Sequence, residues 1–294
     1  MDYNGFVATL SSFICYMSKV LPDDVRTKLY ELREEETDAL PRLIYDTMFE
    51  NQQLAETLDR PCCQDTGVIQ FFARVGTQFP LLDSLQDAFE EAVRIATVAA
   101  PLRHNAQETF DEYNTGGNNG FRLPAIQWTL VRGSELELDI YMAGGGCTLP
   151  GRAMVLMPSA GYEGAAKFVL EVMSGYAPNA CPPLLVGVGI AASVDTAAIL
   201  SKKALLRPIG SRNENARAAY MEELLTQAID EIGFGPQGLR GRRSVMDVHI
   251  EHAARHPSTI GVAVNVGCWS HRRGRLVWHA DGSIHSPTHR GYCE

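Results

Sequence analysis

One short stretch, Arg60 to Gly67, gathers the side chains in this chain that are best suited to chemistry. It reads Arg-Pro-Cys-Cys-Gln-Asp-Thr-Gly, so two adjacent cysteines are followed at once by an amide, a carboxylate and a hydroxyl. The apolar run at residues 68–75 comes next and predicts a buried strand. Placing polar groups on a tight loop against a buried strand costs free energy unless these groups bind a partner. The stretch therefore indicates a ligand or metal site, with a buried cysteine beside a solvated turn as the alternative.

Two further cysteines lie in the same kind of context as Cys63. Cys181 precedes a proline pair and a buried apolar run, and Cys268 follows the end of another such run. The three are far apart in sequence, which excludes a local metal clip. Thiolates are soft metal ligands, and when several occur in one chain the group that they usually bind is an iron–sulfur cluster. Three thiolates instead of four would leave one iron open, able to act as a Lewis acid on a hydroxyl and a carboxylate.

Cysteine usage also bears on the compartment. The chain has seven cysteines, an odd and scattered set without any Cys-x-x-Cys pair. This pattern favours a reducing compartment, the cytoplasm, over a disulfide framework. It also argues against a structural zinc site of the usual spacing.

Composition describes a soluble globular protein of 294 residues, 45% of them hydrophobic, with a net charge of −9. That length supports a substantial core. The acidic balance argues against nucleic acid or an anionic membrane as the main partner. The N-terminus lacks the basic region of a secretory signal, and no apolar run approaches the ~20 residues of a membrane span.

The pattern of elements predicts a mixed α/β (α+β) fold. Residues 1–58 read as a helical N-terminal region, and no repeat or linker divides residues 1–294, so a single domain is expected. The tail at residues 277–294 is expected to be short and exposed. Further helices are predicted at residues 81–102, 162–173, 194–205 and 216–232. Strands are predicted at residues 68–75, 126–131, 136–142, 184–190, 244–250 and 260–266.

Three other features could serve a binding site. Arg103 follows a predicted helix beside an asparagine and could anchor a carboxylate, or it could be a surface arginine favoured by the helix dipole. The run Gly144–Gly146 follows a strand and could expose successive N–H groups to an anion, or form a flexible hairpin. Neither a Walker A nor a Rossmann fingerprint is present. Residues 114–120 form a turn-dense, glycine-rich loop with no evident role.

Several motifs together resemble the class I fumarase family of iron–sulfur hydro-lyases. The similarity extends over about residues 21–277, and the joint set of motifs is highly specific. The motifs are Pro61–Gly67, Ala100–Ala106, Gly144–Gly164, Asn179–Pro183, Arg255–Gly261 and Gly267-Cys268.

The resemblance implies a [4Fe-4S] cluster held by three cysteines, which fall on Cys63, Cys181 and Cys268. A cubane is only a few ångströms across, so these three sulfurs must converge. The remaining cysteines are expected not to be ligands, although Cys62 and Cys147 are the two that could replace a member of the set. The non-ligand cysteines are Cys15, Cys62, Cys147 and Cys293.

The resemblance also assigns roles toward a small dicarboxylate substrate. Gln64 and Asp65 match residues that contact the substrate, and Asp65 would help to orient the catalytic base. Arg103 matches an arginine that binds a substrate carboxylate, and Gly145–Gly146 match backbone donors. His256 matches a histidine near the site, which could handle a proton or could instead cap its loop.

Two departures from the fumarase pattern refine this expectation. Many fumarases carry Ala-Lys before the glycines and Ser after them, whereas this chain has Met142-Ala143 and Cys147. That difference favours dehydration of L-tartrate to oxaloacetate over fumarate and malate chemistry. The family's C-terminal domain, with its catalytic threonine, has no counterpart after Val277. A separate beta subunit is therefore expected to supply that domain in an α2β2 heterotetramer, without which this chain is inactive.

Three alternatives stay open at this point. The nearest is the alpha subunit of a fumarate hydratase, with the same cluster and a different substrate. An iron–sulfur electron carrier or redox sensor would need a fourth cysteine ligand. A metal-free scaffold subunit would simply bury its cysteines.

Overall fold

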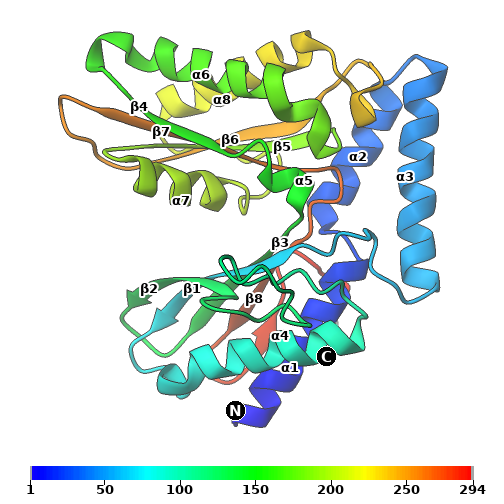
Figure 1. The fold of residues 1–294 in the computed structure, drawn as a ribbon, viewed down its shortest axis with the longest axis vertical. Helices are drawn as coiled ribbons and strands as arrows, with labels where there is room; N and C mark the ends of the chain where they lie inside the picture. Colours follow the sequence, from blue (N-terminus) through cyan, green and yellow to red (C-terminus); the bar gives the residue numbers. More distant parts are fainter. Residues whose placement is uncertain (1, 293–294) are drawn as a thin grey trace. The chain divides into compact units, whose positions relative to one another are not determined.

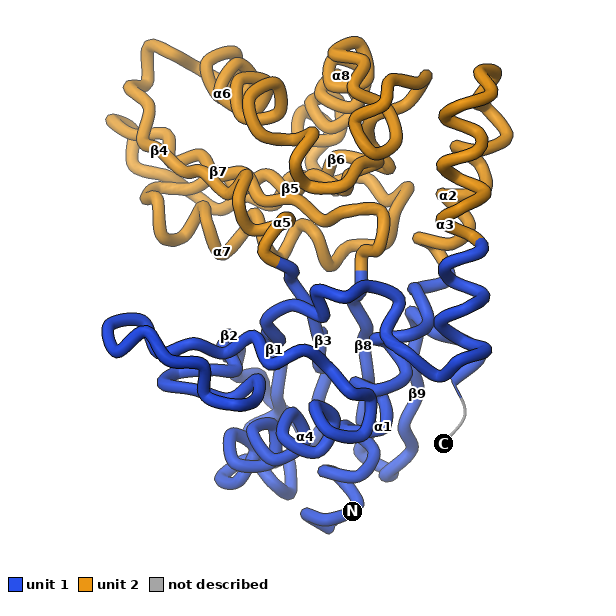
Figure 2. The backbone as a smooth tube through the Cα atoms, turned by 45° about the vertical axis from the view of Figure 1, so that its right-hand side comes forward, with its two compact units in different colours: residues 1–23, 50–144, 272–294 blue, residues 24–49, 145–271 orange. Residues whose placement is uncertain are grey.

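The chain forms two compact units in the computed structural model, which describes residues 2–292 (Figure 2). Unit 1 comprises Met1–Asp23, Glu50–Gly144 and Arg272–Glu294, and unit 2 comprises Asp24–Phe49 and Gly145–His271. Cys293, expected not to be a ligand, lies outside the described residues. Two of the four crossings between units, at residues 144/145 and 271/272, fall in or next to motifs that the sequence singles out.

Unit 1 contains a five-stranded sheet with strand order β2-β1-β3-β8-β9. The β1–β2 pair is parallel, and the other neighbouring pairs are antiparallel. The strands are β1 (Val68–Gly76), β2 (Ala125–Val131), β3 (Leu136–Ala143), β8 (Arg273–Trp278) and β9 (Ile284–His285).

Helices α1 (Tyr3–Lys19) and α4 (Leu85–Ala99) pack against one face of this sheet (Figure 1). The core between them is aromatic: the ring of Phe6 lies 4.9 Å from that of Trp278 and 6.2 Å from that of Phe89. A 3-10 turn, η1 (Leu82–Ser84), precedes α4, so the regular helix is shorter than the predicted 81–102.

Unit 2 contains a four-stranded sheet with order β4-β7-β5-β6, in which only the β5–β6 pair is parallel. Helices α6 and α8 cover one face and α7 covers the other (Figure 1). The strands are β4 (Arg152–Leu156), β5 (Leu184–Ala191), β6 (Val245–His252) and β7 (Ile260–Gly267). The helices are α5 (Gly145–Thr148), α6 (Gly161–Tyr176), α7 (Val194–Ala204) and α8 (Ala216–Ile232), with 3-10 turns η2 (Pro158–Ala160), η3 (Ala177–Ala180) and η4 (Pro236–Gly238).

The glycines of β5 explain how closely α7 approaches the sheet. A Cβ atom on Gly187 would lie 2.1 Å from the carbonyl oxygen of Ser201, and one on Gly189 would lie 1.9 Å from that of Ala197. No side chain fits at either position. The unusual Val-Gly-Val-Gly sequence of this buried strand is therefore a packing requirement of α7.

The other N-terminal helices are α2 (Asp23–Glu35) and α3 (Ala39–Thr57), and the unit boundary at residues 49/50 falls inside α3. Val25 and Leu29 of α2 are fully buried. Arg243 joins this helix to the rest of unit 2, because its guanidinium donates to Glu35 at 2.7 Å and to Asp230 at 3.0 Å.

One described stretch, Tyr3–Glu35, is long and apolar enough to cross a membrane by length and composition alone. Its most apolar window is 56% buried, as in the core helix of a globular unit. The stretch comprises two helices separated by residues 20–22. It is weak evidence for a membrane segment.

The predicted mixed α/β class is confirmed, as is the helical character of the N-terminal region. The predicted exposed tail is exposed only in part, at residues 280–283, 285, 287, 290 and 291. β8 lies inside the sheet of unit 1 between β3 and β9, and Trp278 and His289 are at most 1% exposed. The arginines at 272, 273 and 275 concealed this strand, since charged residues rarely occupy a sheet interior.

Candidate functional site

The turn before β1 presents its two cysteines differently. The N–H of Cys62 donates to the carbonyl of Ser18 at 3.0 Å, and the Cys62 carbonyl accepts from Asn51 Nδ2 at 2.8 Å. Cys62 is 4% exposed, whereas Cys63 is partly exposed and Gln64 is exposed. Cys63 is therefore the more accessible thiol of the pair, as the ligand assignment requires.

Asp65 lies against the end of β3. The Asp65–Gly67 turn closes on itself through a hydrogen bond from the Gly67 N–H to Asp65 Oδ1 at 3.2 Å. Gly67 has a φ of +83°, and a Cβ atom there would lie 2.6 Å from the backbone of Ala143. The carbonyl of Asp65 accepts a 2.7 Å hydrogen bond from Nη2 of Arg272, a side chain that is only 2% exposed. Sequence reasoning missed Arg272, since no local signal links it to Asp65.

Arg103 is held next to this turn by its backbone. Its N–H donates to Thr66 Oγ1 at 3.0 Å, and its side chain is exposed. Thr66 itself is 2% exposed. The structure thus brings together, within unit 1, the predicted carboxylate anchor and the predicted substrate-contacting carboxylate.

Unit 2 brings Cys181 and Cys268 together. The antiparallel register pairs Leu185 with Gly267, so the start of β5 lies beside the end of β7. The N–H of Trp269 donates to the carbonyl of Cys181 at 3.1 Å. Cys181 is exposed, with its backbone in the left-handed region at φ 56°, and Cys268 is 8% exposed. Two of the three predicted ligands are therefore neighbours through the sheet.

The glycine run ends in a single helical turn. Gly145 and Gly146 begin α5, and Cys147, at 7% exposure, is buried in it. Lys202 of α7 is half-buried, with its ammonium nitrogen inside. Desolvation lowers the pKa of this ammonium group, and the charge of the Cys147 thiolate acts in the opposite direction. Cys147 therefore has a lysine ammonium group in its surroundings.

His256 lies in the loop between β6 and β7. Its Nδ1 accepts a hydrogen bond from the Ser258 N–H at 3.1 Å, so the neutral ring carries its proton on Nε2. The side chain is exposed. The ring therefore caps its own turn and still presents Nε2, the atom available for proton transfer.

The predicted ligands divide between the two units, with Cys63 in unit 1 and Cys181 and Cys268 in unit 2. Among residues 2–292, no group of three or more His, Cys, Asp or Glu side chains is gathered as one metal ion would require. The three predicted ligands are thiols on turns that adjoin strands, and Cys63 and Cys181 are accessible. Thiolates are the usual ligands of iron–sulfur clusters.

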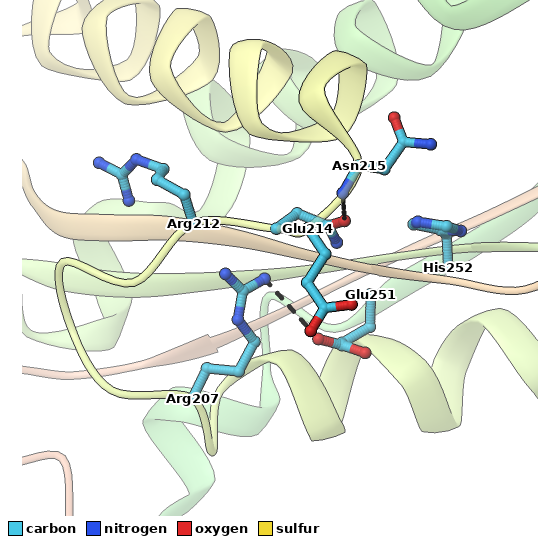
Figure 3. Close-up of a pocket in the computed structure, with 7 residues that line it drawn as sticks. Arg207, Arg212, Glu214, Asn215, Glu251 and His252 are labelled. Carbon is cyan, nitrogen blue, oxygen red and sulfur yellow. Dashed lines mark hydrogen bonds and ion pairs between the residues drawn. The ribbon is translucent and has the colours of Figure 1, made fainter.

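A cavity of about 610 Å³ in unit 2 has none of the predicted site residues in its lining (Figure 3). The two guanidinium groups that line this cavity form ion pairs with carboxylates of the chain itself. Arg207 Nη1 lies 2.7 Å from the buried Glu222 and 3.7 Å from Glu251, and Arg212 Nη1 lies 2.9 Å from Asp247. These ion pairs fasten the α7–α8 connection to β6. The cavity is lined by Arg207, Arg212, Asn213, Glu214, Asn215, Glu251 and His252.

Comparison with known proteins identifies the family of this chain. A protein named "L(+)-tartrate dehydratase subunit alpha" from Escherichia coli (strain UTI89 / UPEC) is 57% identical over 287 residues, covering 97% of this chain and 95% of that protein. Proteins of the same name from Escherichia coli (strain K12) and Shigella sonnei (strain Ss046) are 56% identical with the same coverage. The family model described as "Fumarate hydratase (Fumerase)" matches residues 7–277. Because this match takes in the Cys63 turn, the glycine run and both cysteines of unit 2, the chain belongs to the fumarate hydratase (Fumerase) family.

Proposed function

We propose that this chain is the alpha subunit of an L(+)-tartrate dehydratase, a hydro-lyase that converts L-tartrate to oxaloacetate. The observation that carries the proposal is the 57% identity to a protein of that name over 97% of this chain. The departures at Met142, Ala143 and Cys147 from the fumarase pattern point the same way.

We further propose that Cys63, Cys181 and Cys268 hold a [4Fe-4S] cluster. The accessibility of Cys63 beside a buried Cys62, and the pairing of the other two turns through β5 and β7, support this ligand set. When bound with three protein ligands, such a cluster supplies a Lewis-acidic iron for the hydroxyl that leaves the substrate.

The chain's own residues would bind and orient the dicarboxylate. The exposed guanidinium of Arg103 offers a planar fork to one carboxylate, and Gln64 and Asp65 contact the substrate from the neighbouring turn. The backbone N–H groups of Gly145–Gly146 add neutral donors. Asp65 would orient the base that removes the proton alpha to a carboxylate, and His256 would exchange a proton through Nε2.

A partner chain is part of this proposal. The relatives are named as alpha subunits, which supports a separate beta subunit, and we propose an α2β2 heterotetramer in the cytoplasm. The beta subunit would carry the catalytic base, so this chain alone would be inactive.

The alternative substrate pair is fumarate and malate, which the description of the family model favours. In the deciding experiment, this chain is co-expressed with the proposed beta subunit and the complex is purified without oxygen. The turnover of L-tartrate and of L-malate is then measured. A kcat/KM for L-tartrate at least about tenfold above that for L-malate supports the proposal. The reverse preference assigns a fumarate hydratase, and absence of iron and sulfide from an otherwise folded complex overturns both.

A further inference from the structure

We propose that Asn118, in the glycine-rich loop at residues 114–120, is a positioning residue for Arg103. This inference deepens the proposed function, in which Arg103 binds a substrate carboxylate. It gives a role to a loop whose sequence shows turn character alone.

The side chain of Asn118 ties three segments together. Its Nδ2 donates to the carbonyl of Arg103 at 3.1 Å and to Oγ1 of Thr97 on α4 at 3.1 Å. Its Oδ1 accepts from the N–H of Asn105 at 3.1 Å. Asn118 is 3% exposed. Both N–H groups and the carbonyl of a buried amide are thus engaged, which fixes its orientation.

Thr66 holds the same segment from the other side. Its Oγ1 accepts from the Arg103 N–H at 3.0 Å and from Asn105 Nδ2 at 3.3 Å. Asn105 Nδ2 also donates to the Gly67 carbonyl at 3.1 Å. The N–H and carbonyl of Arg103 are therefore both fixed by buried side chains, Thr66 from the Asp65 turn and Asn118 from the glycine-rich loop.

Fixing the backbone matters because the Arg103 side chain is exposed. A long side chain that binds a ligand carboxylate loses rotamer freedom on binding, and a defined backbone position reduces that cost. Asn118 sets this position without contacting the substrate itself. Its effect should therefore appear mainly in substrate binding and only through Arg103.

The backbone conformation of the loop places Asn118 beside Arg103 and Asn105. Asn114 Oδ1 accepts from the Gly116 N–H at 2.9 Å, and Gly116 has a φ of +80°, a value that favours glycine. The Gly117 carbonyl then accepts from the Ala106 N–H at 3.2 Å. The turn lays residues 115–118 along residues 103–106.

The next residue supplies a matched control. Asn119 also uses its Nδ2 to fasten the loop to α4, donating to the Glu90 carbonyl at 2.9 Å. It shares its loop, residue type and target helix with Asn118 but is not bonded to Arg103 in the described contacts. Asn119 is half-buried and makes one of these bonds, so a purely structural role for Asn118 predicts a larger loss of stability in Asn118→Ala than in Asn119→Ala, and an effect on KM that does not depend on Arg103.

The experiment uses the anaerobically purified two-chain holoenzyme and whichever of L-tartrate and L-malate it turns over faster. We expect N118A to raise KM about 10- to 100-fold with a smaller change in kcat, and N119A to change KM less than about twofold. In an Arg103→Ala background, N118A should add less than about twofold to KM. Amide hydrogen exchange at residues 103–106 should accelerate in N118A and not in N119A.

The inference is overturned if N118A and N119A raise KM equally, or if N118A keeps its full effect in the Arg103→Ala background. A preference of the wild type for L-malate would instead overturn the proposed substrate. The comparison between the two asparagine variants would still decide the role of Asn118, because it is made on the substrate that the enzyme uses.

Discussion

Gly144 lies so close to the carboxylate of Asp65 that a Cβ atom at position 144 would stand 2.9 Å from Oδ2 and 3.2 Å from Cγ. A side chain at position 144 therefore has room only if the Asp65 carboxylate moves. This contact gives a reason for the glycine that follows the last residue of β3, Ala143.

Replacing Gly144 with alanine tests this relationship. The added methyl group meets the end of a side chain, so we expect Asp65 to rotate away at a stability cost of at most about 1 kcal/mol. Activity of the two-chain enzyme should fall much further, at least about tenfold in kcat/KM, because the carboxylate leaves its position. Steady-state kinetics and thermal unfolding of the same preparation measure the two effects.

Gly175→Ala is the control, since a Cβ atom there meets nothing within 4 Å and the residue lies in α6. It should stabilise the protein by about 0.5–1 kcal/mol through helix propensity and leave kcat/KM unchanged. If Gly144→Ala keeps full activity, Asp65 does not need the position observed here.

The cysteines yield a second prediction. Serine at Cys63, Cys181 or Cys268 should reduce iron and acid-labile sulfide of the anaerobically purified enzyme to a small fraction of the wild-type content, because a cluster with three protein ligands cannot spare one. Circular dichroism should show an unchanged fold.

Cys62→Ser and Cys147→Ser are the matched controls, because both cysteines are buried and each lies near a predicted site. Their iron and sulfide contents should equal those of the wild type. A loss of cluster in either control that equals the loss in the ligand variants would show that the ligand set is misassigned.

Some of the strands that could be predicted from sequence are marked by an uninterrupted apolar run. β5 and β7 are buried along almost their whole length, and their predicted ranges differ from the observed ones by one residue. β4 was not predicted although residues 153–156 form an apolar run, and the structure leaves residues 152–155 of this strand exposed. β8 escaped because Arg275 forms a bidentate ion pair with Asp139 across the sheet, at 2.7 Å for both contacts.

The residues of the candidate site also fall into two groups, those that sequence motifs reveal and those that they do not. Residues that would meet the substrate, such as Asp65 and Arg103, stand in motifs that are recognisable one at a time. The residues that hold them do not: Asn118 and Arg272 contact these segments through side-chain-to-carbonyl hydrogen bonds, which impose no local pattern on the sequence. Only the folded chain shows which distant side chain reaches which carbonyl.

Arg272 supports a third prediction. Its Nη2 donates to the Asp65 carbonyl at 2.7 Å, and lysine cannot reproduce the planar fork of a buried guanidinium. We expect Arg272→Lys to lower kcat/KM at least about tenfold, consistent with the loss of a hydrogen bond from a charged group. Arg273→Lys is the control, an equally buried neighbour at 2% exposure. Equal losses of activity and stability in the two variants would assign Arg272 a structural role only.

The fourth prediction concerns pH. Asp247 on β6 is 2% exposed and accepts hydrogen bonds from the Gly210 N–H at 2.7 Å and from Arg212 Nη1 at 2.9 Å. His249 Nε2 lies 3.2 Å from the same carboxylate, and His249 Nδ1 lies 3.2 Å from the Ala204 carbonyl oxygen. Burial alone would raise the pKa of Asp247, but the hydrogen bonds and charges of His249 and Arg212 outweigh it and hold that pKa well below its usual range.

A carboxyl group with a lowered pKa in the folded state stabilises the protein when it is ionised. The contribution of Asp247 is therefore complete above about pH 4, the unfolded-state pKa, and is lost as the pH falls through the folded-state pKa. Asp247→Asn should lower the free energy of unfolding by about 1–3 kcal/mol at pH 7, because the Gly210 N–H and Arg212 lose a charged hydrogen-bond acceptor that is itself buried. The difference between wild type and variant should shrink as the pH falls below 4, as measured by urea unfolding at several pH values. Asp195→Asn is the control, since Asp195 is an exposed carboxylate at the start of α7, and its variant should unfold with nearly the free energy of the wild type at every pH tested. A constant Asp247→Asn difference between pH 7 and pH 3 would mean that the carboxylate is not what joins the α7–α8 connection to β6.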